Sequence, residues 1–242
     1  MPFSPKLRTT SSTRPCGLSR SQRITLSGMD FIPDLSGALY APDFKTLLVA
    51  DLHLEKGTSL ARRGVHLPPY DTRQSLMQLR SVLNETNPER LIFLGDSFHD
   101  RDARERLDAD DLATLRTITS ESETLWITGN HDPSPPEDIG GRVVSEVMLG
   151  AVTLRHEPRA IPSSAFEIAG HLHPAAAIHS RGHRIRCRCF IADQSRIIMP
   201  AFGSYTGALS VTSKAFEGLF GDYHVWMIGT KAIHRFPASQ VR

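Results

Sequence analysis

The stretch Leu47-Leu48-Val49-Ala50-Asp51-Leu52-His53 sets the pattern of this chain, because a short apolar run stops at polar, titratable residues. Runs of this kind are typical of buried β-strands. Three more runs end at a glycine followed by polar residues: 91–94 before Gly95-Asp96, 125–128 before Gly129-Asn130-His131-Asp132, and 166–169 before Gly170-His171-Leu172-His173. In open α/β sheets, ligands bind at the carboxyl ends of the strands. We therefore expect the four polar loops to converge on one site.

The polar side chains of these loops are metal ligands by type. They are carboxylates, imidazoles and one amide: Asp51, Asp96, His53, His156, His171, His173 and Asn130, of which His156 follows a further strand-like run at 151–154. This mixture suits manganese, iron or zinc better than the all-oxygen shells that magnesium and calcium prefer. In Asp51-Leu52-His53 and His171-Leu172-His173, residues two apart on an extended segment point to the same side, so both members would face one pair of metals.

The ordered motifs Asp-x-His, Gly-Asp, Gly-Asn-His-Asp, a later His and Gly-His-x-His run from Asp51 to His173. This set resembles the calcineurin-like metallophosphoesterase superfamily. The resemblance implies an α/β fold, a layered sandwich of two mixed β-sheets flanked by helices. It also implies a metal-dependent phosphoesterase that hydrolyses phosphate esters with two divalent metal ions, for which manganese is our first expectation and iron or zinc the alternatives.

The same resemblance implies a role for each residue of the motifs. Asp51, His53 and His173 would hold the first metal, Asn130, His156 and His171 the second, and Asp96 would bridge both. His131 matches the general acid that protonates the leaving-group oxygen, and Asp132 would orient its imidazole. Many relatives carry an aspartate where this chain has His99, so the role of His99 stays open.

A closer resemblance extends beyond the metal motifs. Segments at 36–40, 50–57, 62–65, 170–174 and 199–207 are similar to those of the bacterial DNA-ligase-associated metallophosphoesterases. The resemblance covers about residues 24–231 and implies a nucleic-acid phosphodiesterase, more narrowly a DNA endonuclease of DNA repair. It also implies action beside an ATP-dependent DNA ligase, a helicase and an exonuclease.

Length and composition limit the remaining possibilities. With 242 residues, 40% of them hydrophobic, the chain can bury one substantial core. Residues 1–23 carry Ser, Thr, Lys and Arg but no acid, so we predict a disordered basic tail followed by a single domain at 24–242. The tail also has the composition of a transit peptide. No run approaches the ~20 apolar residues that span a membrane, so we expect no membrane association and a cytoplasmic protein.

Five arginines are candidates for contact with nucleic acid. The net charge of only +2 gives little support by itself. Arg184, Arg186 and Arg188 alternate with apolar residues, so a strand would place three guanidinium groups on one face. Arg62 and Arg63 follow the first metal motif, and all five are placed to contact a phosphate backbone. A solvated strand face and a solvated helix end are the alternative interpretation.

The same alternating segment contains Cys187 and Cys189, which we predict to be small buried side chains in a reducing cytosol. A zinc site built on them is the alternative.

The hydrophobic periodicity of the sequence predicts further helices and strands. The helices are expected at 71–85 and 109–119 and the strands at 184–191, 196–199, 223–228 and 232–236.

Three classes of function therefore stay open. The first is a manganese-dependent nuclease or phosphodiesterase acting on DNA. The second is a small-molecule or phosphoprotein phosphatase using the same two metals. A deep closed pocket would favour this second class, whereas a flat basic surface would favour the first. The third is a binding module without activity. The presence of His131 argues against the third class, because a scaffold has no need of a general acid.

Overall fold

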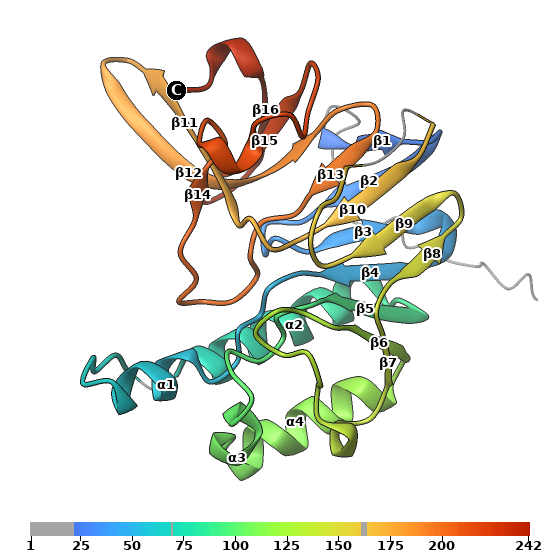
Figure 1. The fold of residues 1–242 in the computed structure, drawn as a ribbon, viewed down its shortest axis with the longest axis vertical. Helices are drawn as coiled ribbons and strands as arrows, with labels where there is room; N and C mark the ends of the chain where they lie inside the picture. The colour runs from blue at the N-terminus through green and yellow to red at the C-terminus, as the bar shows by residue number, and fades with distance from the viewer. Residues whose placement is uncertain (1–21, 69, 161–163) are drawn as a thin grey trace, which may run out of the picture.

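The structure, a computed structural model, describes residues 22–68, 70–160 and 164–242. Most of the tail predicted at 1–23 therefore lies outside the described residues. Figure 1 shows two stacked layers of strands, with the helices gathered on one side of the stack. The prediction of a layered sandwich of two mixed sheets is confirmed.

The first sheet has seven strands in the described part of the chain, and they pair in sequence order. They are β1 (Ile24–Leu26), β2 (Met29–Pro33), β3 (Leu39–Ala41), β4 (Thr46–Val49), β5 (Arg90–Leu94), β6 (Glu123–Ile127) and β7 (Arg142–Val144). Strands β1 to β4 are antiparallel, whereas β4 to β7 are parallel. The carboxyl ends of β4, β5 and β6 therefore lie at the same edge of the sheet.

The second sheet has nine strands among the described residues. Seven follow the order β14 (Leu209–Ser210), β11 (Pro174–Ser180), β12 (His183–Ala192), β13 (Arg196–Ile198), β10 (Phe166–Ala169), β9 (Val152–Arg155) and β8 (Val147–Leu149). The other two are β15 (His224–Ile228), which pairs with β12, and β16 (Ile233–Pro237), which pairs with β15. Strands β9, β10 and β13 are parallel neighbours, so β9 and β10 also end at one edge.

The α-helices of the described segments all precede β6, at α1 (Lys56–Arg62), α2 (Asp71–Thr86), α3 (Ala103–Arg106) and α4 (Ala109–Ser120). Short 3-10 turns occur at η2 (Pro42–Phe44), η3 (Glu137–Ile139), η4 (Lys214–Phe216) and η5 (Ala238–Gln240). Within the described ranges, no helix is long and apolar enough to cross a membrane.

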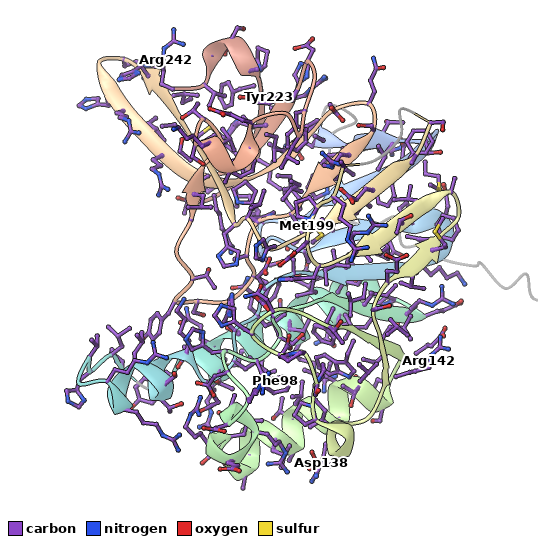
Figure 2. The ribbon with its side chains drawn as sticks, in the orientation of Figure 1. Phe98, Asp138, Arg142, Met199, Tyr223 and Arg242 are labelled. Atoms are coloured by element: carbon purple, nitrogen blue, oxygen red, sulfur yellow. The ribbon has the colours of Figure 1, made fainter. Side chains whose placement is uncertain are left out.

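The core has three parts, one between the sheets and one on each outer face. Leu48 and Ile92 of the first sheet pack with Ile168 and Phe190 of the second in the cluster between the sheets. The helices cover the outer face of the first sheet, where α2 and α4 bury leucine and isoleucine side chains against β4, β5 and β6. The outer face of the second sheet packs against the C-terminal segments. Figure 2 shows Met199 between the sheets.

The predicted strands and helices agree closely with those observed. The helix predicted at 71–85 is α2 and the helix predicted at 109–119 is α4. The N-cap residue of α2 is Tyr70, which makes no side-chain cap hydrogen bond. The Asp71 carboxylate instead accepts a hydrogen bond from the backbone N–H of Gly57 at 2.9 Å, and so ties the start of α2 to the start of α1.

Candidate metal centre

The polar loops that follow β4, β5, β6, β9 and β10 meet at one edge of the two sheets. Backbone hydrogen bonds hold these loops together: the His53 N–H donates to the Asp96 carbonyl at 2.9 Å, and the Gly170 N–H donates to the His156 carbonyl at 3.0 Å. The first of these bonds joins the loops that follow β4 and β5, and the second joins the loops that follow β9 and β10. The predicted convergence of the loops is therefore what the structure shows.

Five of the predicted ligands have left-handed backbone conformations: Asp51 (φ 53°), His53 (φ 46°), Asp96 (φ 48°), His171 (φ 68°) and His173 (φ 44°). The extended geometry expected for the Asp-x-His and His-x-His segments was therefore wrong. A positive φ is uncommon for residues other than glycine, and such conformations concentrate at functional sites. Here it turns side chains from several loops toward one another.

Close backbone approach in this region also requires glycine. A Cβ on Gly129 would lie 2.2 Å from the backbone nitrogen of Asp96. A Cβ on Gly203 would lie only 1.9 Å from the carbonyl oxygen of Leu52. Both distances are far inside van der Waals contact, so any side chain at these positions would push the loops of Asp51 and Asp96 apart.

The first ligand group consists of Asp51, His53 and His173, whose ligand atoms lie within 4.8 Å of one another. The Nε2 atom of His173 lies 3.3 Å from Oδ1 of Asp51 and 3.4 Å from Nε2 of His53. At the other side of its ring, His173 Nδ1 lies 3.1 Å from the Gly207 carbonyl. A carbonyl can only accept, so Nδ1 carries the hydrogen and Nε2 presents a lone pair to the group.

The second ligand group consists of Asp96, His156 and His171. His156 Nδ1 donates to the Leu94 carbonyl at 2.9 Å, which leaves the lone pair on Nε2. That Nε2 lies 3.0 Å from Oδ1 of Asn130, 3.1 Å from Nδ1 of His171 and 3.4 Å from Oδ2 of Asp96. Several lone pairs thus point into the same small space, which is unfavourable unless a proton or a metal cation lies among them.

Asp96 lies between the two groups. Its Oδ1 accepts a hydrogen bond from the His131 N–H at 2.8 Å. Its Oδ2 lies 3.4 Å from His156 Nε2 and 3.9 Å from His53 Nε2, so it faces one imidazole of each group. A carboxylate in this position could be shared by two metals. The donor atoms present therefore fit a pair of divalent metal ions.

The electrostatics of the site also favour a cation. Burial lowers the pKa of His156, but its hydrogen bond to Asp96 and the charges of Asp51 and Asp96 outweigh this effect and raise that pKa to about 9. Burial would raise the pKa of Asp96, yet the hydrogen bond and charge of His156 hold it at about 2. The two carboxylates thus stabilise a positive charge at a buried position, where an unpaired charge would be costly.

His131 and Asp132 lie next to the ligand groups. The His131 ring packs edge-on against the His53 ring, with centroids 5.0 Å apart. Its Nδ1 donates to the His99 carbonyl at 2.8 Å, and the His99 ring stacks against it. The expectation that Asp132 orients this imidazole was therefore wrong, since the backbone of His99 does so.

Asp132 holds backbone instead. Its buried carboxylate accepts hydrogen bonds from the N–H groups of Ser97 at 2.8 Å, Phe98 at 3.1 Å and Gly129 at 3.1 Å. Burial raises the pKa of Asp132 to about 7 even though these backbone bonds favour the charged form. Asp132 thereby ties the loop after β5 to the loop after β6, and it fixes Asp96 relative to Asn130.

The predicted arginines are in three different situations. Arg188 is half-buried and donates to the carbonyls of Ala201 at 3.0 Å and Leu35 at 3.2 Å. Arg186 donates to the Ala208 carbonyl at 2.6 Å, while Arg184 is exposed. The three do share one face of β12, as the alternation predicted. Arg188, however, is committed to holding loops of the protein.

The remaining two predicted arginines lie at the end of α1. Arg62 lies 3.8 Å from Asp102 in an exposed ion pair, and Arg63 is exposed as the C-cap residue of the helix. Burial, together with the charges of Lys56, His131 and Arg63, lowers the pKa of His99 to about 4. Arg63 is therefore near the site, on the side of His99.

Sequence reasoning missed Lys56, the first residue of α1. Burial is the largest cause of the lowered pKa of His53 and of His99, and the charge of the half-buried Lys56 ammonium group acts in the same direction. Burial also lowers the pKa of Lys56 itself. Lys56 follows His53 by three residues, so its closeness to the first metal motif in the sequence was the only available signal. The two cysteines, by contrast, agree in part with expectation. Cys189 is buried and Cys187 half-buried, and neither joins a metal-binding group in the described part of the chain.

Comparison with solved structures found proteins that are similar to this chain. The crystal structure of Pseudomonas putida nuclease MPE is 30% identical in sequence, with 89% of this chain and 99% of that chain covered and a TM-score of 0.71. The structure of Yfce, a phosphoesterase from E. coli, is 12% identical, with 79% of this chain and 97% of that chain covered and a TM-score of 0.43. No protein-family model and no curated protein matches the sequence.

The fold and the paired histidine and aspartate groups define a metal-dependent phosphoesterase, a hydrolase. The chain belongs to the calcineurin-like metallophosphoesterase superfamily, in the ligase-associated group whose motifs it carries.

Proposed function

We propose that this protein is a nuclease that hydrolyses phosphodiester bonds of DNA, as an endonuclease in DNA repair. The observation that carries the proposal is the position of Asp96, whose Oδ2 faces His53 of one ligand group and His156 of the other. A shared carboxylate between two groups of imidazole and carboxylate ligands is the arrangement of a dinuclear hydrolytic site.

Each metal has its own ligands in this proposal. Asp51, His53 and His173 hold the first metal, Asn130, His156 and His171 the second, and Asp96 both. Bound there, the two ions would supply an acidified water and neutralise charge on the phosphoryl oxygens. Manganese suits the mixed oxygen and nitrogen ligands, with iron or zinc as alternatives.

The chain itself supplies the proton for the leaving group. His131 lies against His53, and the His99 carbonyl accepts from its Nδ1, so the ring is held with Nε2 free. When protonated at Nε2, it can donate that proton to the departing oxygen. Asp132 contributes by fixing the loops that carry Asp96 and Asn130, not by contact with the His131 ring.

The exposure of the site supports a polymeric substrate. His131 and Asn130 are exposed, and His171 and His173 are partly exposed, so a strand lying across the surface can reach the ligands. The similar Pseudomonas putida protein is named a nuclease. Resemblance to the ligase-associated group supports a cytoplasmic role beside an ATP-dependent DNA ligase, a helicase and an exonuclease.

A comparison of substrates tests the proposal. Purified protein is loaded with manganese, iron or zinc and assayed on plasmid DNA, single-stranded DNA, an aryl phosphodiester and a nucleotide monoester, with a chelator-treated sample as the control. We expect metal-dependent cleavage of DNA and of the diester, including internal nicks in circular plasmid. Hydrolysis of the monoester alone would contradict the proposal and favour a phosphatase.

A further inference from the structure

A pocket of about 230 Å³ adjoins the metal centre on the side of the second ligand group. It shares two of its walls, Asn130 and His156, with that group. The remaining wall is formed by side chains from the ends of β6, β7 and β9: Thr128, Ser145, Arg155, Glu157 and Arg159. Polar residues, among them two arginines and one glutamate, thus line a space that opens next to proposed ligands of the second metal.

The main chain of Arg159 is fixed from below by a buried ion pair. Glu167 and Arg196, which are 0% and 3% exposed, lie 2.7 Å apart. Glu167 accepts a hydrogen bond from the Arg159 N–H at 3.2 Å, and the Arg196 guanidinium donates to the Arg159 carbonyl. Both polar groups of the Arg159 backbone are therefore held, while its side chain is 67% exposed at the pocket.

The acids around the pocket leave the Arg159 guanidinium available. Glu146 lies 3.7 Å from Arg159 but closer to Arg155, at 3.2 Å, and exposed ion pairs contribute little. Arg155 is also paired with Glu167 at 3.1 Å. Glu157 lies 3.9 Å from Nε2 of His171, so that acid faces an imidazole. Arg159 is thus the cation of this pocket with the weakest competing contacts.

We propose that this pocket is a subsite for a second phosphate group of the substrate strand, bound by Arg159. This inference rests on the proposed nuclease function. A nucleic-acid strand carries one phosphate about every 3.4 Å along a duplex axis, so a phosphate next to the scissile one falls beside the metal centre. The planar guanidinium group can donate two hydrogen bonds to that phosphate, and contacts of this kind fix the register of the strand.

The test uses the metal-loaded, full-length protein and the variant Arg159→Gln. Because the fixed contacts of this residue come from its backbone, the variant keeps them, and its melting temperature should equal that of the wild type. We expect the ratio of kcat/KM on DNA to kcat/KM on an aryl phosphodiester to fall about tenfold, the lower end of the effect of one charged hydrogen bond. The slope of log kcat/KM on DNA against log salt should flatten by about 0.9 for duplex or about 0.7 for single strands.

Two further variants serve as controls. Arg159→Lys keeps the charge but loses the forked donor geometry, so its ratio should fall between those of the wild type and Arg159→Gln. Arg142→Gln removes an exposed arginine from β7 and should leave ratio and slope at wild-type values. Wild-type ratio and slope in Arg159→Gln, or equal losses on both substrates, would overturn the subsite. Failure of the wild-type protein to cleave DNA at all would instead overturn the proposed function, and the subsite with it.

Discussion

The metal centre and the arginine face of β12 both contain polar residues that the sequence identified, yet the structure treats them differently. At the metal centre, backbone bonds between loops and left-handed conformations fix each ligand. On β12, Arg184, Arg186 and Arg188 share one face, but Arg188 is half-buried and contacts two carbonyls, Arg186 is exposed and contacts one carbonyl, and Arg184 is exposed. The backbone holds the short polar side chains of the loops close together, whereas long flexible side chains take whatever partners the fold supplies.

The largest expected effect is at the shared ligand. Asp96→Asn should lower the occupancy of both metals and reduce kcat by more than a hundredfold. Removing a residue that only hydrogen-bonds to a metal ligand already lowers metal affinity or activity by about 10- to 100-fold, and Asp96 is expected to be a ligand itself. Metal content by mass spectrometry and kcat on an aryl phosphodiester measure this. The exposed Asp43→Asn is the matched control. Two bound metals with near-normal activity in Asp96→Asn would show that the centre is not built around this carboxylate.

The next effect separates proton transfer from metal binding. His131→Ala should keep both metals and lose rate by roughly 10²- to 10⁴-fold on alkyl diesters. The loss should be much smaller on activated aryl esters, because a good leaving group departs without a proton. Kinetics on a series of leaving groups, with metal content measured in parallel, provide the measurement. An equal loss across the series would assign His131 another role.

A smaller effect tests the division among the arginines of β12. Arg188→Gln leaves the carbonyls of Leu35 and Ala201 without their donor, so we expect it to lower the free energy of unfolding by about 1–3 kcal/mol. Arg184→Gln should change it by less than about 0.5 kcal/mol. Urea denaturation of the two variants gives both values. Equal stability of the two variants would mean that the contacts of Arg188 do not stabilise the fold.

The smallest effect concerns DNA contact by the exposed member of this face. Arg184→Gln should flatten the slope of log affinity against log salt by about 0.9 on duplex DNA or about 0.7 on single strands. The sequence alone suggested three such contacts, but Arg188 is already occupied. Fluorescence anisotropy across a salt series measures the slope. No change would assign Arg184 to a solvated strand face, the alternative that its sequence pattern left open.

Most of the fold and the ligand set were predictable because their signals are local. A buried strand is a short apolar run, and a ligand loop is the few residues after it, so Asp51, Asp96 and His171 could be found without knowing what packs against them. The helices at α2 and α4 followed from periodicity in the same way. That residues 24–242 form a single domain stays a prediction.

Tertiary structure alone decided the partners of residues far apart in the chain. Arg188 meets Leu35 across 153 positions, and Asp132 meets Ser97 across 35. The backbone of Arg159 is held by an ion pair between two other strands. No local pattern encodes such contacts, because they depend on which strands become neighbours in the sheets. The sequence therefore determined which residues can bind metal, and the packing of the two sheets decided which of its charged side chains remain free to meet a substrate.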